Sequence, residues 1–281
     1  MKKREYYSIR TGKMVSGQEI NLPVLKRLFM AVYNKMTEEG YFQKYFGYYC
    51  VDGECIGELG RDIDSIIFIN IRKENLYPVY QKIDNYSEDD LFDVIEFLHD
   101  HCSKGIEGDY HSWNDCGYHY HTFDDEAGQK HFRELLNLIL KDYMEPYELS
   151  VNGEILSLGD QGLHSILTAG IPTKEEQNVS SRIEKSILKF RRYKSSISER
   201  HEAVRELVDV LEYLRPKAKI YLDKKDENEL FNIANNFGIR HHNEIQKTGY
   251  DKAIWLSWMF YHYLATIHAL LRLIEKNEAS V

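Results

Sequence analysis

The chain has 281 residues, of which 43% are hydrophobic, so it is long enough for one large domain or two ordinary domains with sizeable cores. Its formal charge of −9 argues against a general nucleic-acid binder, because affinity for phosphates depends on clustered cations. The first residues contain no apolar run typical of a secretion signal, and the 4 cysteines form no C-x-x-C pair. We therefore expect reduced thiols and a cytoplasmic protein.

Charge is distributed unevenly along the chain. Residues 1–172 contain 17 Lys and Arg against 29 Asp and Glu, whereas residues 173–281 contain 19 against 16. After Ile171-Pro172 the hydrophobic pattern also becomes wholly helical. We therefore predict an acidic N-terminal accessory or sensor domain over 1–172 and a helical domain over 173–281.

Helices are predicted at three places in the N-terminal domain. Apolar residues at helical spacing predict helices over 23–39 and 126–143. Ser87, followed by three acidic residues, predicts that another helix begins there, because acidic side chains stabilise the first turn.

Short strands are also expected in this domain. Residues 41–60 are rich in aromatic residues and glycine, and we expect loops or short strands. The isoleucine-rich stretch from Asp62 to Lys73 is ambiguous between strand and helix. Asn152-Gly153 between two short apolar stretches predicts a β-hairpin.

Four helices are predicted for the second domain. The first carries an apolar stripe formed by Val179, Ile183, Ile187 and Phe190. The second begins at a capping box of Ser196 and Glu199 and is expected to end at Pro216. The third runs from about Asp226 to Asn236, and the last from about Asp251 to Glu275. The predicted fold class is α+β, mainly α, with a small β-hairpin in the N-terminal domain and a helical bundle in the second.

An arginine and two histidines precede the last helix, in the stretch Phe237-Gly-Ile-Arg-His-His-Asn-Glu-Ile-Gln-Lys247. Metal-independent cleavage of RNA needs a base for the ribose 2′-hydroxyl proton, an acid for the leaving 5′ oxygen and a cation for the phosphate. Arg240 stays charged at any working pH and histidine changes charge near neutrality, so Arg240, His241 and His242 are the predicted catalytic residues. Asn243 can orient an imidazole or a phosphate oxygen. We expect neither a metal ion nor another cofactor in this reaction.

A compact helical unit with Arg and His at the start of its last helix resembles the HEPN superfamily, over about residues 176–276. The whole chain is also similar to proteins of bacterial abortive-infection systems, in which an accessory domain precedes a HEPN-like domain. The family motif is an Arg, often followed by a polar residue, then four to six residues and a His. Arg240 and His241 match its first two positions, whereas no histidine stands at 245–247. The resemblance implies a dimeric, metal-independent endoribonuclease that acts in phage defence or as a toxin.

Two alternatives remain open. The missing histidine favours a non-catalytic, HEPN-like interaction module of a defence system. A metal-dependent hydrolase is the other alternative, because residues 99–121 are rich in histidine and cysteine, which are good zinc ligands. No spacing in this stretch matches a zinc finger. On a helix, His99 and His101 would point apart. On a strand, His119 and His121 would share one face. Aromatic packing and loop anchoring explain the same residues without a metal.

The last helix is apolar on nearly every side from Ala253 to Ile274. We expect it in the centre of a bundle or at a homodimer interface rather than in a membrane, because Arg272 would lie at bilayer depth. A two-fold dimer would bring two copies of the Arg240 motif together. The residues predicted to bind the RNA substrate, with tRNA as a candidate, are Asn243, Lys247, His268 and Arg272. For His268 the alternative is a hydrogen-bonded place in the core. The N-terminal domain is expected to bind a partner or sense a trigger.

Overall fold

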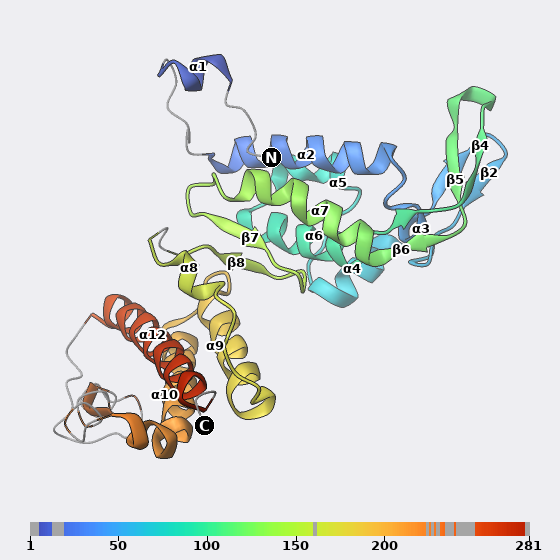
Figure 1. The fold of residues 1–281 in the computed structure, drawn as a ribbon. Helices are drawn as coiled ribbons and strands as arrows, with labels where there is room; N and C mark the ends of the chain where they lie inside the picture. Colours follow the sequence, from blue (N-terminus) through green and yellow to red (C-terminus); the bar gives the residue numbers. More distant parts are fainter. Residues whose placement is uncertain are drawn as a thin grey trace. The chain divides into compact units, whose positions relative to one another are not determined.

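The computed structural model describes residues 6–12, 20–159, 162–222, 225, 228, 231–233, 239 and 251–278. The chain divides into two compact units, Met1–Ser157 and Leu158–Val281 (Figure 1). Helices predominate and the strands are few and short, so the fold is α+β, mainly α, as predicted. The division falls before Pro172, where the composition changes, because Leu167 in α8 (His164–Leu167) is already buried in the core of the second unit.

Three helices form the framework of the first unit: α2 (Leu22–Glu38), α6 (Glu88–Asp100) and α7 (Asp125–Leu140). α7 packs against both α2 and α6. Each helix begins at a side chain that accepts a hydrogen bond from the backbone N–H three residues later, namely Asn21, Ser87 and Asp124. The three helices predicted for this part of the chain are therefore confirmed. Their buried faces consist of Leu25, Phe29, Met36, Leu91, Ile95, Leu98, Phe132, Leu136 and Leu140.

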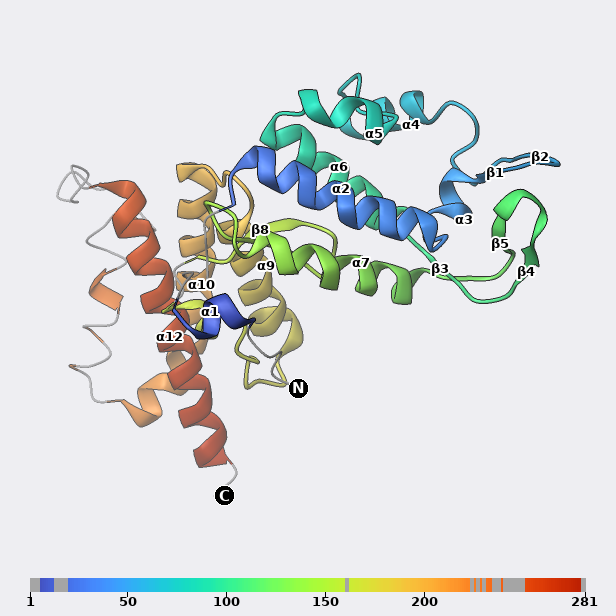
Figure 2. The same ribbon diagram turned by 90° about the horizontal axis from the view of Figure 1, so that it is seen from above.

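Two antiparallel hairpins extend from the same end of this framework, as Figures 1 and 2 both show. β1 (Tyr48–Cys50) pairs with β2 (Gly53–Cys55), and β4 (Gly108–His111) pairs with β5 (Gly117–Tyr120). Gln43, the first residue of α3 (Gln43–Phe46), joins α3 to β5. Its Nε2 donates to the carbonyl of Tyr118 at 2.9 Å, and its Oε1 accepts from the N–H of Tyr120 at 3.1 Å. Because α3 leads directly into β1, Gln43 holds both hairpins at one place.

The remaining elements of the first unit are α1 (Tyr7–Arg10), α4 (Ile63–Ile71), α5 (Val79–Lys82), η1 (Ile83–Asn85), β3 (Lys104–Gly105), η2 (Trp113–Asp115), β6 (Phe123–Asp124), β7 (Tyr147–Leu149) and β8 (Ile155–Ser157). β3 pairs with β6, and β7 with β8, both antiparallel. The isoleucine-rich stretch is thus the helix α4, capped by Asp62. The hairpin predicted at Asn152-Gly153 is confirmed as β7–β8; Gly153 has φ +82°, a conformation that favours glycine.

The second unit is built from α9 (Ser181–Arg191), α10 (Ile197–Tyr221) and α12 (Lys252–Glu278), preceded by α8 and by the single π-helical turn η3 (Glu176–Ser180). α10 packs against α9 and α12. Phe190 of α9 stacks on Phe260 of α12, with ring centroids 3.8 Å apart. The predicted capping box of Ser196 and Glu199 is present at the start of α10. The short helix predicted from Asp226 to Asn236 falls largely outside the described residues.

The prediction that the second helix ends at Pro216 is wrong, because α10 continues to Tyr221. Proline has no backbone N–H, so the helix lacks the hydrogen bond from this position to the carbonyl of Glu212. Leu214 and Ala218, on either side of Pro216, are both buried in the apolar core. Burial of this helix face outweighs the local cost of the proline.

Replacing Pro216 with Ala restores the missing backbone donor. We expect the free energy of unfolding to rise by about 1–3 kcal/mol, since proline is the least favourable residue in a helix interior. Denaturant titration followed by far-UV circular dichroism measures the change. Pro146→Ala, in a segment outside the helices, should bring no such increase. An unchanged or lower stability of Pro216→Ala would contradict the prediction.

Candidate metal centre

Four potential metal ligands lie together where the β1–β2 and β4–β5 hairpins meet. They are Cys50, His111, Cys116 and His119. One sulfur or ring nitrogen from each lies within 4.8 Å of the other three. Cys50 Sγ and His111 Nδ1 are 3.3 Å apart. The cluster combines β1, the β4–β5 hairpin and its turn.

Strand register explains why the two histidines face each other. In the β4–β5 hairpin His111 is opposite Gly117, and Asp109 is opposite His119. His111 and His119 are therefore diagonal neighbours on one face of the hairpin, and their ring centroids are 5.4 Å apart. Cys116 lies in the tight turn, just before Gly117, which has φ +81°. The turn thus brings its thiol to the same face as the imidazoles.

Asp52, in the turn between β1 and β2, contacts two members of the cluster. Its backbone N–H donates to Cys50 Sγ at 3.5 Å, and its Oδ2 lies 3.7 Å from His111 Nε2. The N–H of Asp52 lowers the pKa of the Cys50 thiol, but burial and the neighbouring Cys116 and Asp52 side chains outweigh it, so the pKa is raised. The carboxylate thus lies near Nε2 of His111, whereas Nδ1 of the same ring faces Cys50.

His119 carries the clearest sign that a ligand belongs here. Its Nε2 is buried and has no hydrogen-bond partner among the described residues. One face of its ring stacks on Tyr48, with centroids 4.4 Å apart. Buried polar atoms are rarely left without a partner, so this nitrogen is available to bind an additional group.

Two thiols and two imidazoles form a donor set that suits Zn²⁺. In tetrahedral zinc sites, bond lengths of about 2.3 Å to sulfur and about 2.0 Å to nitrogen place the ligand atoms about 3.3–3.8 Å apart. The 3.3 Å between Cys50 and His111 falls in this range, and the upper limit of 4.8 Å for the other pairs exceeds it by about 1 Å. Four protein ligands leave no coordination position for a water molecule.

Other residues of the histidine-rich stretch lie outside the cluster. His99 is buried, close to Asp100 and Arg133, and His101 Nδ1 donates to the carbonyl of Phe97 at 2.7 Å. The two histidines thus contact different partners, and neither belongs to the cluster. Cys50 lies outside the histidine-rich stretch 99–121. It precedes His111 by 61 positions and reaches the cluster only in the folded chain.

Most of the predicted catalytic site falls outside the described residues: Arg240, His241, His242, Asn243 and Lys247. His268 and Arg272 lie on α12, where Arg272 is exposed. His268 is only 5% exposed, and neither ring nitrogen has a hydrogen-bond partner among the described residues. Burial therefore places His268 in the apolar core, where it is poorly placed for the predicted contact with RNA.

Comparison with models of known protein families, with curated proteins and with solved structures finds no match for this chain. Among the helices that the structure describes, none is both long enough and apolar enough to cross a membrane.

The burial of His268 predicts a pH-dependent stability. Burial, with Arg272 nearby, lowers the pKa of His268 below its ordinary value of 6.5. Below pH 6.5 the unfolded chain therefore binds a proton that the folded unit still excludes, so the free energy of unfolding decreases as the pH falls towards the lowered pKa. His268→Leu should lose part of this decrease in denaturant titrations at neutral and mildly acidic pH. His121→Leu, at an exposed position of the first unit, should keep all of it. An identical decrease in wild type and His268→Leu would refute the assignment.

Proposed function

We propose that the first unit is a zinc-binding module in which Cys50, His111, Cys116 and His119 hold a structural Zn²⁺. The observation that carries the proposal is the meeting of these four ligand atoms within 4.8 Å. The closed ligand set supports a structural role for the metal and disfavours the metal-dependent hydrolase, which needs an open coordination position.

Outside the cluster, the hydrogen bonds of Gln43 and the stack of Tyr48 on His119 join the two hairpins. An isolated two-stranded hairpin is marginally stable in water. Large aromatic side chains on these strands face solvent, with 83% of Tyr49, 58% of Tyr110 and 53% of Tyr118 exposed. A metal bound by β1 and by the β4–β5 hairpin would fix the two relative to each other. The exposed rings would then form a preorganised surface for binding a partner, in agreement with a non-catalytic role for this unit.

Metal analysis of the purified protein tests the zinc site. We expect one Zn²⁺ per chain by atomic emission, with proton release on binding because thiolates are the ligands. Cys50→Ser and Cys116→Ser should lose the metal, whereas Cys55→Ser should retain it, because Cys55 is exposed and outside the cluster.

Hydrogen exchange gives a second measure of the same site. Removal of zinc should speed amide exchange in both hairpins and leave the core of α7 unchanged. Zinc-free protein from a metal-replete preparation, or full occupancy in Cys50→Ser, would exclude the proposed site.

For the second unit we propose metal-independent cleavage of RNA, with Arg240 neutralising the phosphate and His241 or His242 transferring the proton. Two observations favour it. The elements described in this unit are all helical, in agreement with the resemblance to HEPN proteins. α12 also has an outward face on which Ile254 (66% exposed), Trp258 (42%) and two alanines are accessible, which suits a two-fold contact between chains.

Incubation of the purified protein with total RNA and tRNA in EDTA tests this activity. We expect products ending in 2′,3′-cyclic phosphate and a loss of about 100-fold or more in Arg240→Ala, since the arginine stabilises the transition-state charge. Arg205→Ala, an exposed arginine on α10, is the matched control and should cleave normally. Undiminished cleavage by Arg240→Ala would disprove the assignment, and no cleavage by wild type would favour the interaction module.

A further inference from the structure

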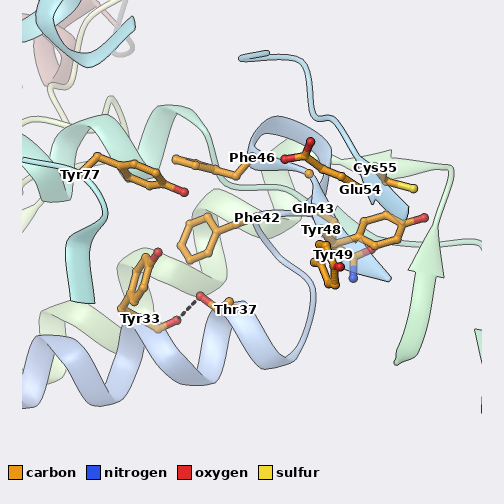
Figure 3. A pocket seen from close by; sticks show the side chains of 11 residues that line it. Tyr33, Thr37, Phe42, Gln43, Phe46, Tyr48, Tyr49, Glu54, Cys55 and Tyr77 are labelled. Carbon is orange, nitrogen blue, oxygen red and sulfur yellow. Dashed lines mark hydrogen bonds between the residues drawn. The ribbon is translucent and has the colours of Figure 1, made fainter. Parts of the chain in front are cut away.

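A second feature of the first unit is a pocket of about 370 Å³ beside the β1–β2 hairpin. Six of its eleven lining residues are aromatic, as Figure 3 shows: Tyr33, Phe42, Phe46, Tyr48, Tyr49 and Tyr77. The rings come from α2, α3, β1 and the segment before α5. None of the four candidate metal ligands lines the pocket.

The aromatic walls are fixed by packing among themselves. Tyr33 stacks on Phe42 at 5.5 Å between centroids, and Phe46 stacks on Tyr77 at 6.0 Å. Phe42 and Phe46 meet edge to face at 5.7 Å. A continuous wall of rings therefore exists without a ligand, which reduces the entropy lost when a ligand binds.

Among the described residues that line the pocket, only one carries a formal charge, and this charge is negative. Glu54 contributes a carboxylate, and among the described residues no Lys, Arg or His lines the pocket. Arg61 Nε lies 3.6 Å from Glu54, but both side chains are more than half exposed, so water weakens this ion pair. The surrounding residues 1–157 carry 17 Lys and Arg against 28 Asp and Glu. Anionic ligands, including phosphates, are therefore disfavoured.

The phenol groups add to this polarity. Burial raises the pKa of Tyr33 to about 12 and also raises that of Tyr77. Both remain neutral at physiological pH, so their oxygens carry lone pairs rather than a full charge. The Gln43 amide is already hydrogen-bonded to the backbone of β5 and is not available.

We infer that this pocket binds a small organic cation with an alkylated ammonium group, held against the aromatic faces and paired with Glu54. Such a cation is weakly hydrated and gains from several ring faces at once, whereas its charge is complemented by one carboxylate. The inference goes beyond the zinc module, since the wall of Tyr33, Phe42, Phe46 and Tyr77 involves no metal ligand.

Calorimetric titration with choline tests the inference. The matched control ligand is its neutral carbon isostere, in which a tert-butyl group replaces the trimethylammonium group. The two differ in charge and hardly in shape, so we expect choline to bind at least about 10-fold more tightly. Equal affinity for the isostere, or no measurable binding of choline, would overturn the inference.

Two exposed positions allow variants that preserve the fold. Glu54→Gln should weaken choline binding by about 3- to 10-fold and leave the isostere unaffected, because only the charge is removed. Tyr49→Leu should weaken it by about 2- to 5-fold through loss of a ring face. The matched controls Glu58→Gln and Tyr110→Leu, which lie outside the pocket lining, should bind like wild type. Zinc content measured on the same preparations separates this test from that of the metal centre.

Discussion

The arrangement of the first unit depends on how two hairpins with exposed aromatic faces are kept together. Tight apolar burial stabilises α2, α6 and α7, whereas in β1–β2 and β4–β5 only Cys50 is buried. Polar contacts perform this role instead. Gln43 pairs with the backbone of β5 much as a neighbouring strand would, and the thiol and imidazole groups converge from three segments. Both the candidate metal centre and the aromatic pocket depend on these contacts, which keep the two hairpins together.

Much of the fold could be predicted from the sequence because helix caps and helical periodicity are local signals. Ser87 and Ser196 correctly predict where two helices begin, and Asn152-Gly153 correctly predicts a hairpin. The prediction that a helix ends at Pro216 was wrong. The free-energy cost of a helical proline can be judged from the local sequence, whereas the burial of Leu214 and Ala218 depends on tertiary packing. The rule that proline ends a helix fails where tertiary contacts stabilise the helix by more free energy than the proline costs.

The candidate metal centre was only partly predictable. Three of its members, His111, Cys116 and His119, lie in the stretch that was singled out for its histidines and cysteines. Their shared face depends on the register of a hairpin whose turn the sequence did not define. No motif spacing predicts that Cys50 joins the cluster, because α3 and β1 bring it there from a distant part of the chain. His268 shows the reverse case, since helical spacing suggested a functional residue and packing placed it in the core.

Tyr48 belongs to both sites of the first unit. One face of its ring stacks on His119, and the side chain also lines the aromatic pocket (Figure 3). A ring that contacts both sites can couple zinc at the one to a cation at the other, and such coupling is reciprocal. If bound zinc raises the affinity of the pocket for a cation by some factor, the bound cation raises the affinity of the metal centre for zinc by the same factor. With both proposed ligands bound, the position of one tyrosine would make the zinc occupancy of the unit and its cation occupancy depend on each other.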